Sequence, residues 1–277
     1  MIAPTIRVEQ LVYHYEESIP ALNGVDLEIG SNAFLAIVGQ NGSGKTTLVK
    51  HFNGLLKPTS GRVYIGELET SRASVGELAR TVGYVFQNPD HQIFCPTVRE
   101  EIAFGPRNLG LGSDEIAHRV EEALQLFGLG YHANLPPAVL GFGLRRKVSI
   151  AAVYAMHPRI LILDEPVAGL DARSARELLA LVGELHAKGH TIIVVTHNMR
   201  LVAEYAEQTL VMQDGRVLAY GPTRQVLCRI EALHRAKIAP PQVTQLGRRL
   251  AEQGFGDDIL TVDEFCGEYG RIRGGGR

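Results

Sequence analysis

The chain has 277 residues, with 28 lysine and arginine side chains against 30 aspartate and glutamate side chains, and the net charge of −2 gives no electrostatic support for binding nucleic acid. This length is sufficient for a large α/β domain with an appended segment. No stretch reaches the ~18 continuous apolar residues of a membrane-spanning helix, and the widely separated cysteines, Cys95, Cys228 and Cys266, favour a reducing compartment over a disulfide framework.

The first predicted elements are strands. Residues 6–13 and 21–29 alternate apolar and polar side chains, which is typical of a sheet with one buried face, and they predict a small antiparallel sheet. Residues 34–38 form a continuous apolar run instead. Such a run indicates a central strand that is buried on both faces.

A phosphate-binding pattern follows this central strand. Residues 39–47 read Gly-Gln-Asn-Gly-Ser-Gly-Lys-Thr-Thr and match G-x-x-x-x-G-K-[ST] between a predicted strand and a predicted helix. Glycines let backbone N–H groups and the helix N-terminus face polyphosphate oxygens. Lys45 can reach the β- and γ-phosphates, and the Thr46 hydroxyl can ligate Mg²⁺. The expected nucleotide-binding residues of the loop are Gly39, Asn41, Gly42, Ser43, Gly44, Lys45, Thr46 and Thr47.

Helical patterning dominates the middle of the chain. Residues about 88–157 are expected to form an inserted helical subdomain. Within it, Ser113 is expected to cap a helix whose first turn contains Asp114 and Glu115, because a serine oxygen can accept from the free N–H groups of that turn.

Two carboxylates follow a second apolar run, residues 160–163. Asp164 and Glu165 therefore lie at the C-terminal end of a predicted buried strand, where open α/β sheets bind ligands. We expect Asp164 to hold Mg²⁺, directly or through water, and Glu165 to orient or deprotonate an attacking water. The alternative, a merely polar strand end, is disfavoured by the phosphate-binding pattern in the same chain.

The remaining elements complete an α/β pattern. An amphipathic helix is predicted over residues 172–188 and a third apolar strand over residues 191–195. Because helices separate the three apolar strands, we expect a parallel sheet. We place one domain at residues 1–220 and a C-terminal extension at residues 221–277.

A histidine pair lies near the end of the predicted helix, at a spacing that some metal sites use. His186 and His190 are spaced i, i+4, but Gly189 interrupts the helix between them, and no adjacent acid completes a ligand set. We expect both side chains to be solvated.

The order of motifs resembles that of ABC transporter ATP-binding subunits over about residues 5–230. The resemblance implies a P-loop NTPase with a RecA-like core, a small antiparallel β-subdomain and an inserted helical subdomain. It further implies that Tyr15 stacks on adenine, although a strand tyrosine can also serve packing. Gln87 matches the Q-loop glutamine that touches Mg²⁺ or water, and His197 matches the switch histidine that contacts the γ-phosphate. Asp171 ends the matching D-loop segment and is implied at a nucleotide site.

The family signature, Leu-Ser-Gly-Gly-Gln, is degenerate in this chain. Its place holds Leu-Gly-Phe-Gly-Leu at residues 140–144. In the family, this segment binds the γ-phosphate on the other subunit, so Gly141 and Gly143 are implied as nucleotide contacts. Gly141 cannot supply the serine hydroxyl, and Phe142 places a ring where backbone should approach phosphate.

The degenerate signature bears on the choice of partner. A homodimer would contain two impaired sites, whereas a heterodimer with a second ATPase of regular signature would keep one good site. Since losing one oxyanion-type donor commonly costs about 10²- to 10³-fold in rate, we favour a heterodimer. A slow homodimer is the alternative.

Two segments resemble a particular subgroup, the energy-coupling-factor (ECF) ATPases. Residues 85–106 resemble their Q-loop region, and residues 239–246 with 258–262 resemble their C-terminal extension. The resemblance implies an ATPase with ATP and Mg²⁺ as cofactors, peripheral on the cytoplasmic face of the cell membrane, that powers uptake of a vitamin or of cobalt or nickel ions. The implied partners are a second ABC ATPase held through the extension, a transmembrane scaffold protein and a substrate-binding membrane protein.

Asp90, beside Gln92, is the expected scaffold contact, and capping of the local turn is the alternative role. Two other function classes stay open: a soluble ABC ATPase, which lacks support because the chain has no coiled-coil insertion, and a regulatory nucleotide-binding partner. The degenerate signature favours the regulatory class, and the intact Glu165 opposes it.

Overall fold

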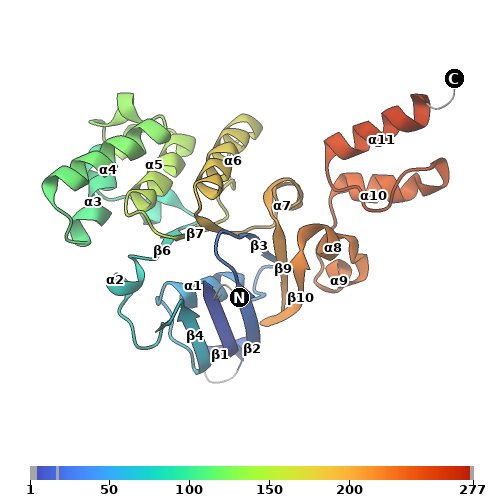
Figure 1. The fold of residues 1–277 in the computed structure, drawn as a ribbon, viewed down its shortest axis with the longest axis horizontal. Coiled ribbons are helices and arrows are strands. Elements are labelled where there is room, and N and C mark those ends of the chain that lie inside the picture. Colours follow the sequence, from blue (N-terminus) through green and yellow to red (C-terminus); the bar gives the residue numbers. More distant parts are fainter. Residues whose placement is uncertain (1–4, 17–18, 275–277) are drawn as a thin grey trace.

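The computed structural model describes residues 5–16 and 19–274 of the chain (Figure 1). The strands expected over residues 6–13 and 21–29 form β1 and β2 and pair antiparallel as predicted, and β1 also pairs with β4, which the sequence did not predict. They form a sheet of order β2-β1-β4-β5, with strands β1 (Ile6–His14), β2 (Pro20–Ile29), β4 (Ser60–Ile65) and β5 (Leu68–Glu69).

A larger sheet forms the centre of the molecule. Its order is β10-β9-β3-β8-β7-β6, and its strands run parallel except for the edge strand β10. The apolar runs at residues 34–38, 160–163 and 191–195 all become strands whose residues are buried, which confirms the predicted α/β class. The strands are β3 (Phe34–Gly39), β6 (Val82–Val85), β7 (Ile160–Asp164), β8 (Thr191–Val195), β9 (Gln208–Gln213) and β10 (Arg216–Pro222).

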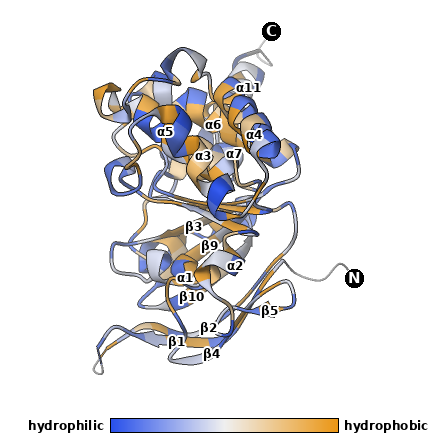
Figure 2. Ribbon diagram, turned by 90° about the vertical axis from the view of Figure 1, so that its left-hand side faces the viewer, coloured by the Kyte–Doolittle hydropathy of each residue, from blue (hydrophilic) through white to orange (hydrophobic). Residues whose placement is uncertain are grey.

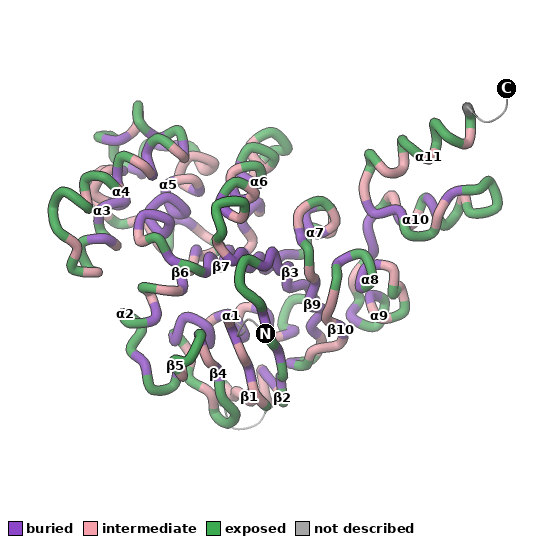
Figure 3. The backbone as a smooth tube through the Cα atoms, in the orientation of Figure 1, coloured by how far each residue is buried: buried purple, intermediate pink, exposed green. Residues whose placement is uncertain are grey.

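The central sheet separates two hydrophobic cores. Successive side chains of a strand point to opposite faces, so Phe34, Ala36 and Val38 pack in one core while Leu35 and Ile37 pack in the other. Figure 2 shows the mostly hydrophobic strands edge-on between the two groups of helices. Burial on both sides fixes the carboxyl ends of β3, β7 and β8 relative to one another (Figure 3).

Three long helices cover one face at one end of the molecule, within residues 88–157 (Figure 1). Ser113 was expected to cap one of them, and this prediction is wrong. Gly112 takes the extended capping position, with ψ 157°, and Ser113 is the first helical residue, so no side-chain oxygen caps this helix. The helical elements of this segment are η1 (Pro89–His91), α3 (Val98–Asn108), α4 (Ser113–Leu126), η2 (Gly130–His132), η3 (Pro137–Val139) and α5 (Phe142–Tyr154).

The other helices surround the sheet or lie beyond it. The expected boundary between residues 220 and 221 falls inside β10, and α8 follows that strand directly. These helices are α1 (Lys45–Phe52), α2 (Val75–Leu78), α6 (Ala172–Ala187), α7 (Met199–Tyr205), α8 (Thr223–Cys228), α9 (Ile230–Arg235), α10 (Gln242–Arg249), η4 (Ala251–Gln253) and α11 (Val262–Gly274).

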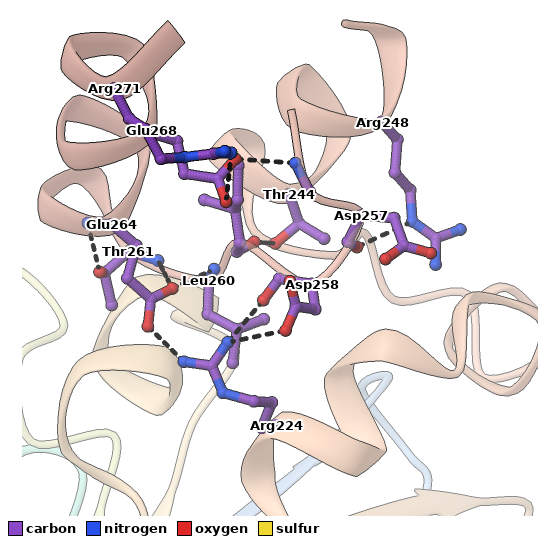
Figure 4. Close-up of polar contacts among 12 residues, drawn as sticks. Arg224, Thr244, Arg248, Asp257, Asp258, Leu260, Thr261, Glu264, Glu268 and Arg271 are labelled. Atoms are coloured by element: carbon purple, nitrogen blue, oxygen red, sulfur yellow. Dashed lines mark hydrogen bonds and ion pairs between the residues drawn. The ribbon is translucent and has the colours of Figure 1, made fainter. Parts of the chain in front are cut away.

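Polar contacts of one arginine fasten the C-terminal helices to the rest of the fold. Arg224 of α8 donates a hydrogen bond of 2.7 Å to the carbonyl oxygen of Asp258, and its guanidinium also pairs with Glu264 of α11 (Figure 4). Within the extension, the Thr244 hydroxyl of α10 donates to the carbonyl of Ile259 at 2.5 Å. Within the extension, Asp258 and α11 are therefore tied to α8, the helix that follows the edge strand of the sheet.

Candidate nucleotide site

The loop between β3 and α1 accepts only glycine at two positions. A Cβ atom at Gly39 would lie 2.5 Å from the carbonyl oxygen of Met212, and one at Gly44 would lie 2.7 Å from the carbonyl oxygen of Ala21. Gly44 also has a left-handed φ of 98° and precedes α1 without any side-chain cap. The first N–H groups of α1 therefore remain available to bind an anion.

Lys45 is held inside this loop. Its Nζ donates hydrogen bonds of 2.8 Å to the carbonyl of Gly39 and 2.7 Å to that of Gln40. Burial lowers the pKa of Lys45, and the nearby charges of Glu165 and Asp164 oppose that shift. The ammonium group is thus positioned in the loop and faces two carboxylates.

The side chain of Ser43 contributes little to the loop surface. Its hydroxyl is buried and has no hydrogen-bond partner among the described residues. It does not line the cavity described below. The expected contact of Ser43 with a nucleotide therefore stays a prediction.

Two hydroxyl groups converge on one carboxylate oxygen of Asp164. The Thr46 hydroxyl donates to Oδ2 at 3.1 Å, and the Tyr84 hydroxyl donates to the same oxygen at 2.8 Å. Thr46 and Asp164 offer oxygen donors, the type that Mg²⁺ prefers, so they fit such an ion. Sequence reasoning missed Tyr84, because it stands in an apolar strand where an aromatic ring is normally a packing residue.

Glu165 and His197 contact each other at the ends of neighbouring strands. His197 Nδ1 lies 2.7 Å from Glu165 Oε1, and the Thr196 hydroxyl donates to Oε2 at 3.3 Å. Glu165 has a left-handed φ of 47°, and its N–H donates to the carbonyl of Val195 at 2.8 Å. A non-glycine residue in this region is strained by about 1–3 kcal/mol, which the surrounding contacts must offset.

One cavity of about 1200 Å³ collects most of the expected residues. Tyr15 stands at its wall with 60 % of its surface exposed, shares a hydrogen bond of 3.1 Å with the Thr47 hydroxyl, and meets the Tyr13 ring edge-on at 5.0 Å. One face of the Tyr15 ring is thus available to a flat ligand. The expected residues that line the cavity are Tyr15, Gly39, Asn41, Gly42, Gly44, Lys45, Thr46, Thr47, Gln87, Asp164, Glu165 and His197.

Besides Ser43, three expected nucleotide contacts lie outside this cavity. Gly141 is the N-cap of α5, and Gly143 lies in its first turn near Leu170. Asp171 caps α6, where its carboxylate accepts hydrogen bonds of 2.9 Å from the N–H groups of Arg173 and Ser174. None of these three residues lines the chain's own cavity, so their expected nucleotide contacts stay predictions.

The cavity is also lined by two segments that sequence reasoning did not assign to it, α7 and the C-terminal extension. Residues 199–200 of α7 and Glu204 contribute, and so do residues 237–243 and 260–262 of the extension. Their placement depends on how α8 and α9 pack, which no local pattern reveals. The extension therefore borders the same space as the phosphate-binding loop.

Two minor expectations are wrong. His186 and His190 are half-buried, not solvated: His186 Nε2 lies 2.9 Å from the carbonyl of Asn32, and His190 Nδ1 lies 2.7 Å from that of Pro158. Burial lowers the pKa of His190. The two histidines are thus structural residues that satisfy backbone carbonyls.

The alternative role of Asp90 as a turn cap is also wrong. Asn88 takes the capping position, and its side-chain oxygen accepts from the N–H of Asp90. The Asp90 carboxylate is 53 % exposed and lies 3.2 Å from Nε of Arg145. It remains able to meet a partner molecule, in competition with Arg145.

Comparison with known proteins identifies similar chains. A profile of the ABC transporter family matches residues 22–168. The chain is 41 % identical over 279 residues to the energy-coupling factor transporter ATP-binding protein EcfA2 of Clostridium tetani, covering 97 % of both. It is 43 % identical over 260 residues to EcfA of Methanoculleus marisnigri, covering 94 % of both. It spans only 45 % of a third relative, the ABC transporter ATP-binding protein TTE1589 of Caldanaerobacter subterraneus.

Solved structures agree with these relatives. CbiO1 of Clostridium perfringens, described as part of the ABC transporter complex cbiONQ, superposes with a TM-score of 0.77 at 36 % identity and covers 90 % of this chain and 99 % of its own. The dimeric cassette MJ0796, bound to ADP and phosphate in a post-hydrolysis state, gives a TM-score of 0.71 at 28 % identity, covering 79 % and 98 %. Within residues 5–16 and 19–274, no helix has the length and apolar character to cross a bilayer.

Proposed function

Since this chain belongs to the ABC transporter family, and within it to the energy-coupling factor ATP-binding proteins, we propose that it is the ATP-hydrolysing subunit of an ECF-type uptake transporter. The observation that carries the proposal is the contact between Glu165 and His197 on the wall of the cavity that also holds Lys45. Glu165 as the base, His197 as the switch residue and the phosphate-binding loop with Lys45 would then act on one nucleotide.

The chain's own residues divide the work of hydrolysis. The loop N–H groups and Lys45 bind the phosphates, and Tyr15 stacks on the adenine. Glu165 accepts the proton of the attacking water, and His197 exchanges its bond to Glu165 for one to the γ-phosphate. The residues that would hold Mg²⁺ are Thr46, Asp164 and Gln87, and the ion would supply charge stabilisation at the phosphate oxygens.

A second ATPase subunit completes the site in this proposal. Gly141, Gly143 and Asp171 lie outside the chain's own cavity, which supports a role toward the nucleotide of a partner. Because the signature lacks its serine and amide, we favour a heterodimer over a homodimer. The extension from about residue 221 would contact the second ATPase.

The same proposal places the chain on the cytoplasmic face of the membrane. It would be held there by a transmembrane scaffold, with Asp90 as a contact, and would act with a substrate-binding membrane protein. The cargo would be a vitamin or a cobalt or nickel ion. No residue of this chain would touch the cargo, so the cargo is identified through the partners.

Purification from native membranes tests the proposal. The chain is tagged in its own cell, the membranes are solubilised in mild detergent, and co-purifying proteins are identified by mass spectrometry against an untagged strain. We expect a second ABC ATPase, a scaffold membrane protein and a small substrate-binding membrane protein. Membrane subunits without a second ATPase would replace the heterodimer by a homodimer, and recovery in the soluble fraction alone would contradict transport.

A further inference from the structure

Arg146 of α5 is a buried cation that hydrolysis does not explain. None of its surface is exposed, and no carboxylate among the described residues forms an ion pair with it. Its Nη1 donates a hydrogen bond of 2.7 Å to the carbonyl of Phe86, its Nη2 donates to the carbonyl of Gln87, and its Nε has no partner. Burial lowers the pKa of Arg146, and the nearby charge of Asp164 opposes that shift only in part, so the buried guanidinium is costly to the fold.

The two acceptors belong to the loop that carries Gln87 into the nucleotide cavity. Arg146 reaches this loop from the helix that starts at the degenerate signature. A guanidinium with a planar fork can hold two neighbouring carbonyls at once, which a lysine cannot do. Arg146 therefore holds the backbone at Gln87, a residue that lines the cavity.

The bulky residue of the signature takes part in the same contact. The guanidinium carbon of Arg146 lies 5.6 Å from the ring centre of Phe142, one helical turn earlier. The Phe142 ring also lies 3.2 Å from where a Cβ atom of Gly169 would stand, and Gly169 has a left-handed φ of 77°. Phe142 thus packs inward between Arg146 and the D-loop of its own chain.

Further contacts fasten the loop after Gln87 to α5. The side chain of Gln92 accepts from the N–H of Phe86 at 3.1 Å and donates to the carbonyl of Ser149 at 2.8 Å. The ion pair between Arg145 and Asp90, at 3.2 Å, adds another link. Hydrogen bonds and an ion pair therefore connect residues 86–92 to α5 at several points.

We propose that Arg146 is a positioning residue that holds Gln87 in the nucleotide cavity and makes the Q-loop and the signature helix move together. The nucleotide bound by this chain then influences the orientation of the segment that this chain offers to its partner. The expected effect of Arg146 on kcat rests on the proposed hydrolytic function. The connection that Arg146 makes between the Q-loop and α5 does not, because it lies within this chain.

Hydrogen exchange of the full chain tests the tie without any activity. In Arg146→Gln, we expect amides of residues 83–94 to exchange about tenfold or more faster, because opening of this segment no longer breaks the guanidinium contacts. The matched control is Lys147→Gln on the same helix, whose ammonium forms an ion pair with Glu177 at 3.4 Å and leaves the loop untouched. If Arg146→Gln does not fold, Arg146→Lys keeps the charge, loses the fork and should give the same local increase.

A double-mutant cycle tests the action through Gln87. The purified ATPase complex is compared with Arg146→Gln, Gln87→Ala and the double variant. We expect each single change to lower kcat by about tenfold with little change in KM, and the double variant to be no slower than the slower single variant. Additive losses, or unchanged exchange in residues 83–94, would overturn the proposal. If the wild-type complex does not hydrolyse ATP, the proposed function is contradicted. The hydrogen-exchange result alone then decides whether Arg146 connects the Q-loop to α5.

Discussion

At the scale of single residues, the proposed hydrolysis uses Glu165 as its base, and the side chain of this left-handed residue is held by His197 and Thr196. Glu165→Gln keeps the shape of the side chain but removes the base. We expect turnover to fall by about 10²- to 10⁴-fold, the usual contribution of general base catalysis. ATP binding should persist, so an ATP-bound dimer should accumulate in size-exclusion chromatography. Glu177→Gln, far from the cavity, is the control, and unchanged turnover in Glu165→Gln would remove Glu165 as the base.

Tyr84 acts on the same site through its contact with Asp164. Its hydroxyl donates to Asp164, while its ring meets Phe86 edge-on at 4.9 Å. Tyr84→Phe keeps the ring and loses a hydrogen bond to a charged group, worth about 1.5–3 kcal/mol. We expect Mn²⁺ binding with ATP, measured by electron paramagnetic resonance, to weaken about tenfold or more. Tyr220→Phe, whose hydroxyl bonds the carbonyl of Glu28 elsewhere, should leave it unchanged.

Tyr15 offers a direct optical test of base stacking, because the chain has no tryptophan. In Tyr15→Trp, the introduced indole should keep the π-face toward the ligand. We expect its fluorescence to change on addition of ATP and to respond far less to inorganic triphosphate, which lacks a base. An equal response to both ligands would mean that this residue senses phosphate or closure and does not stack on adenine.

At the scale of elements, the sequence predicted the parts whose periodicity is strong. The apolar runs became central strands because burial on both faces leaves polar side chains only at strand ends, Asp164 of β7 and Thr191 of β8. The phosphate-binding loop could be placed because its glycines are required by close backbone approach. The start of α4 was missed by one residue, because Gly112 adopts the capping conformation without a side chain to signal it.

Contacts between distant segments could not be predicted. The role of Arg146 depends on where the Q-loop lies relative to α5, and the half-burial of His186 depends on Phe34, whose ring it meets at 5.5 Å. The position of the extension depends on the contacts of Arg224. A single sequence contains no local pattern for such pairings.

Arg224 of α8 holds the segment that contains α10 and α11. Arg224→Gln removes the ion pair with Glu264 and the bond to the carbonyl of Asp258. Exposed ion pairs are worth little alone, so we expect the melting temperature of the main domain to change little. The segment around residues 235–242 should become more sensitive to limited proteolysis, since α10 and α11 lose their tie to α8. Arg271→Gln, whose nitrogen lies 3.9 Å from Glu268 within α11, is the control. Unchanged cleavage would show that apolar packing alone holds the extension.

At the scale of the whole molecule, the proposed function requires this chain to offer a full set of phosphate-site residues to its own nucleotide and a degenerate signature to a partner. Gly141→Ser restores the missing hydroxyl at a position where an added Cβ atom meets nothing within 4 Å. In the purified chain alone, we expect hydrolysis to rise by up to about 10²-fold, the reverse of losing one such donor. Gly112→Ser places the same cap on α4 and should have no effect on hydrolysis. An ordinary transporter rate in the unaltered chain, with no gain from Gly141→Ser, would remove the basis for the heterodimer.

The extension lines the cavity that also contains the phosphate-binding loop, although the two are about 200 residues apart in sequence. Suppose that nucleotide changes the affinity of the extension for a second subunit. Thermodynamic reciprocity then requires that binding of that second subunit to the extension changes nucleotide affinity by the same factor. An antibody fragment against α10 and α11 that binds the nucleotide-bound and nucleotide-free states with different affinity would likewise act as an allosteric effector of ATP, without contacting the phosphates.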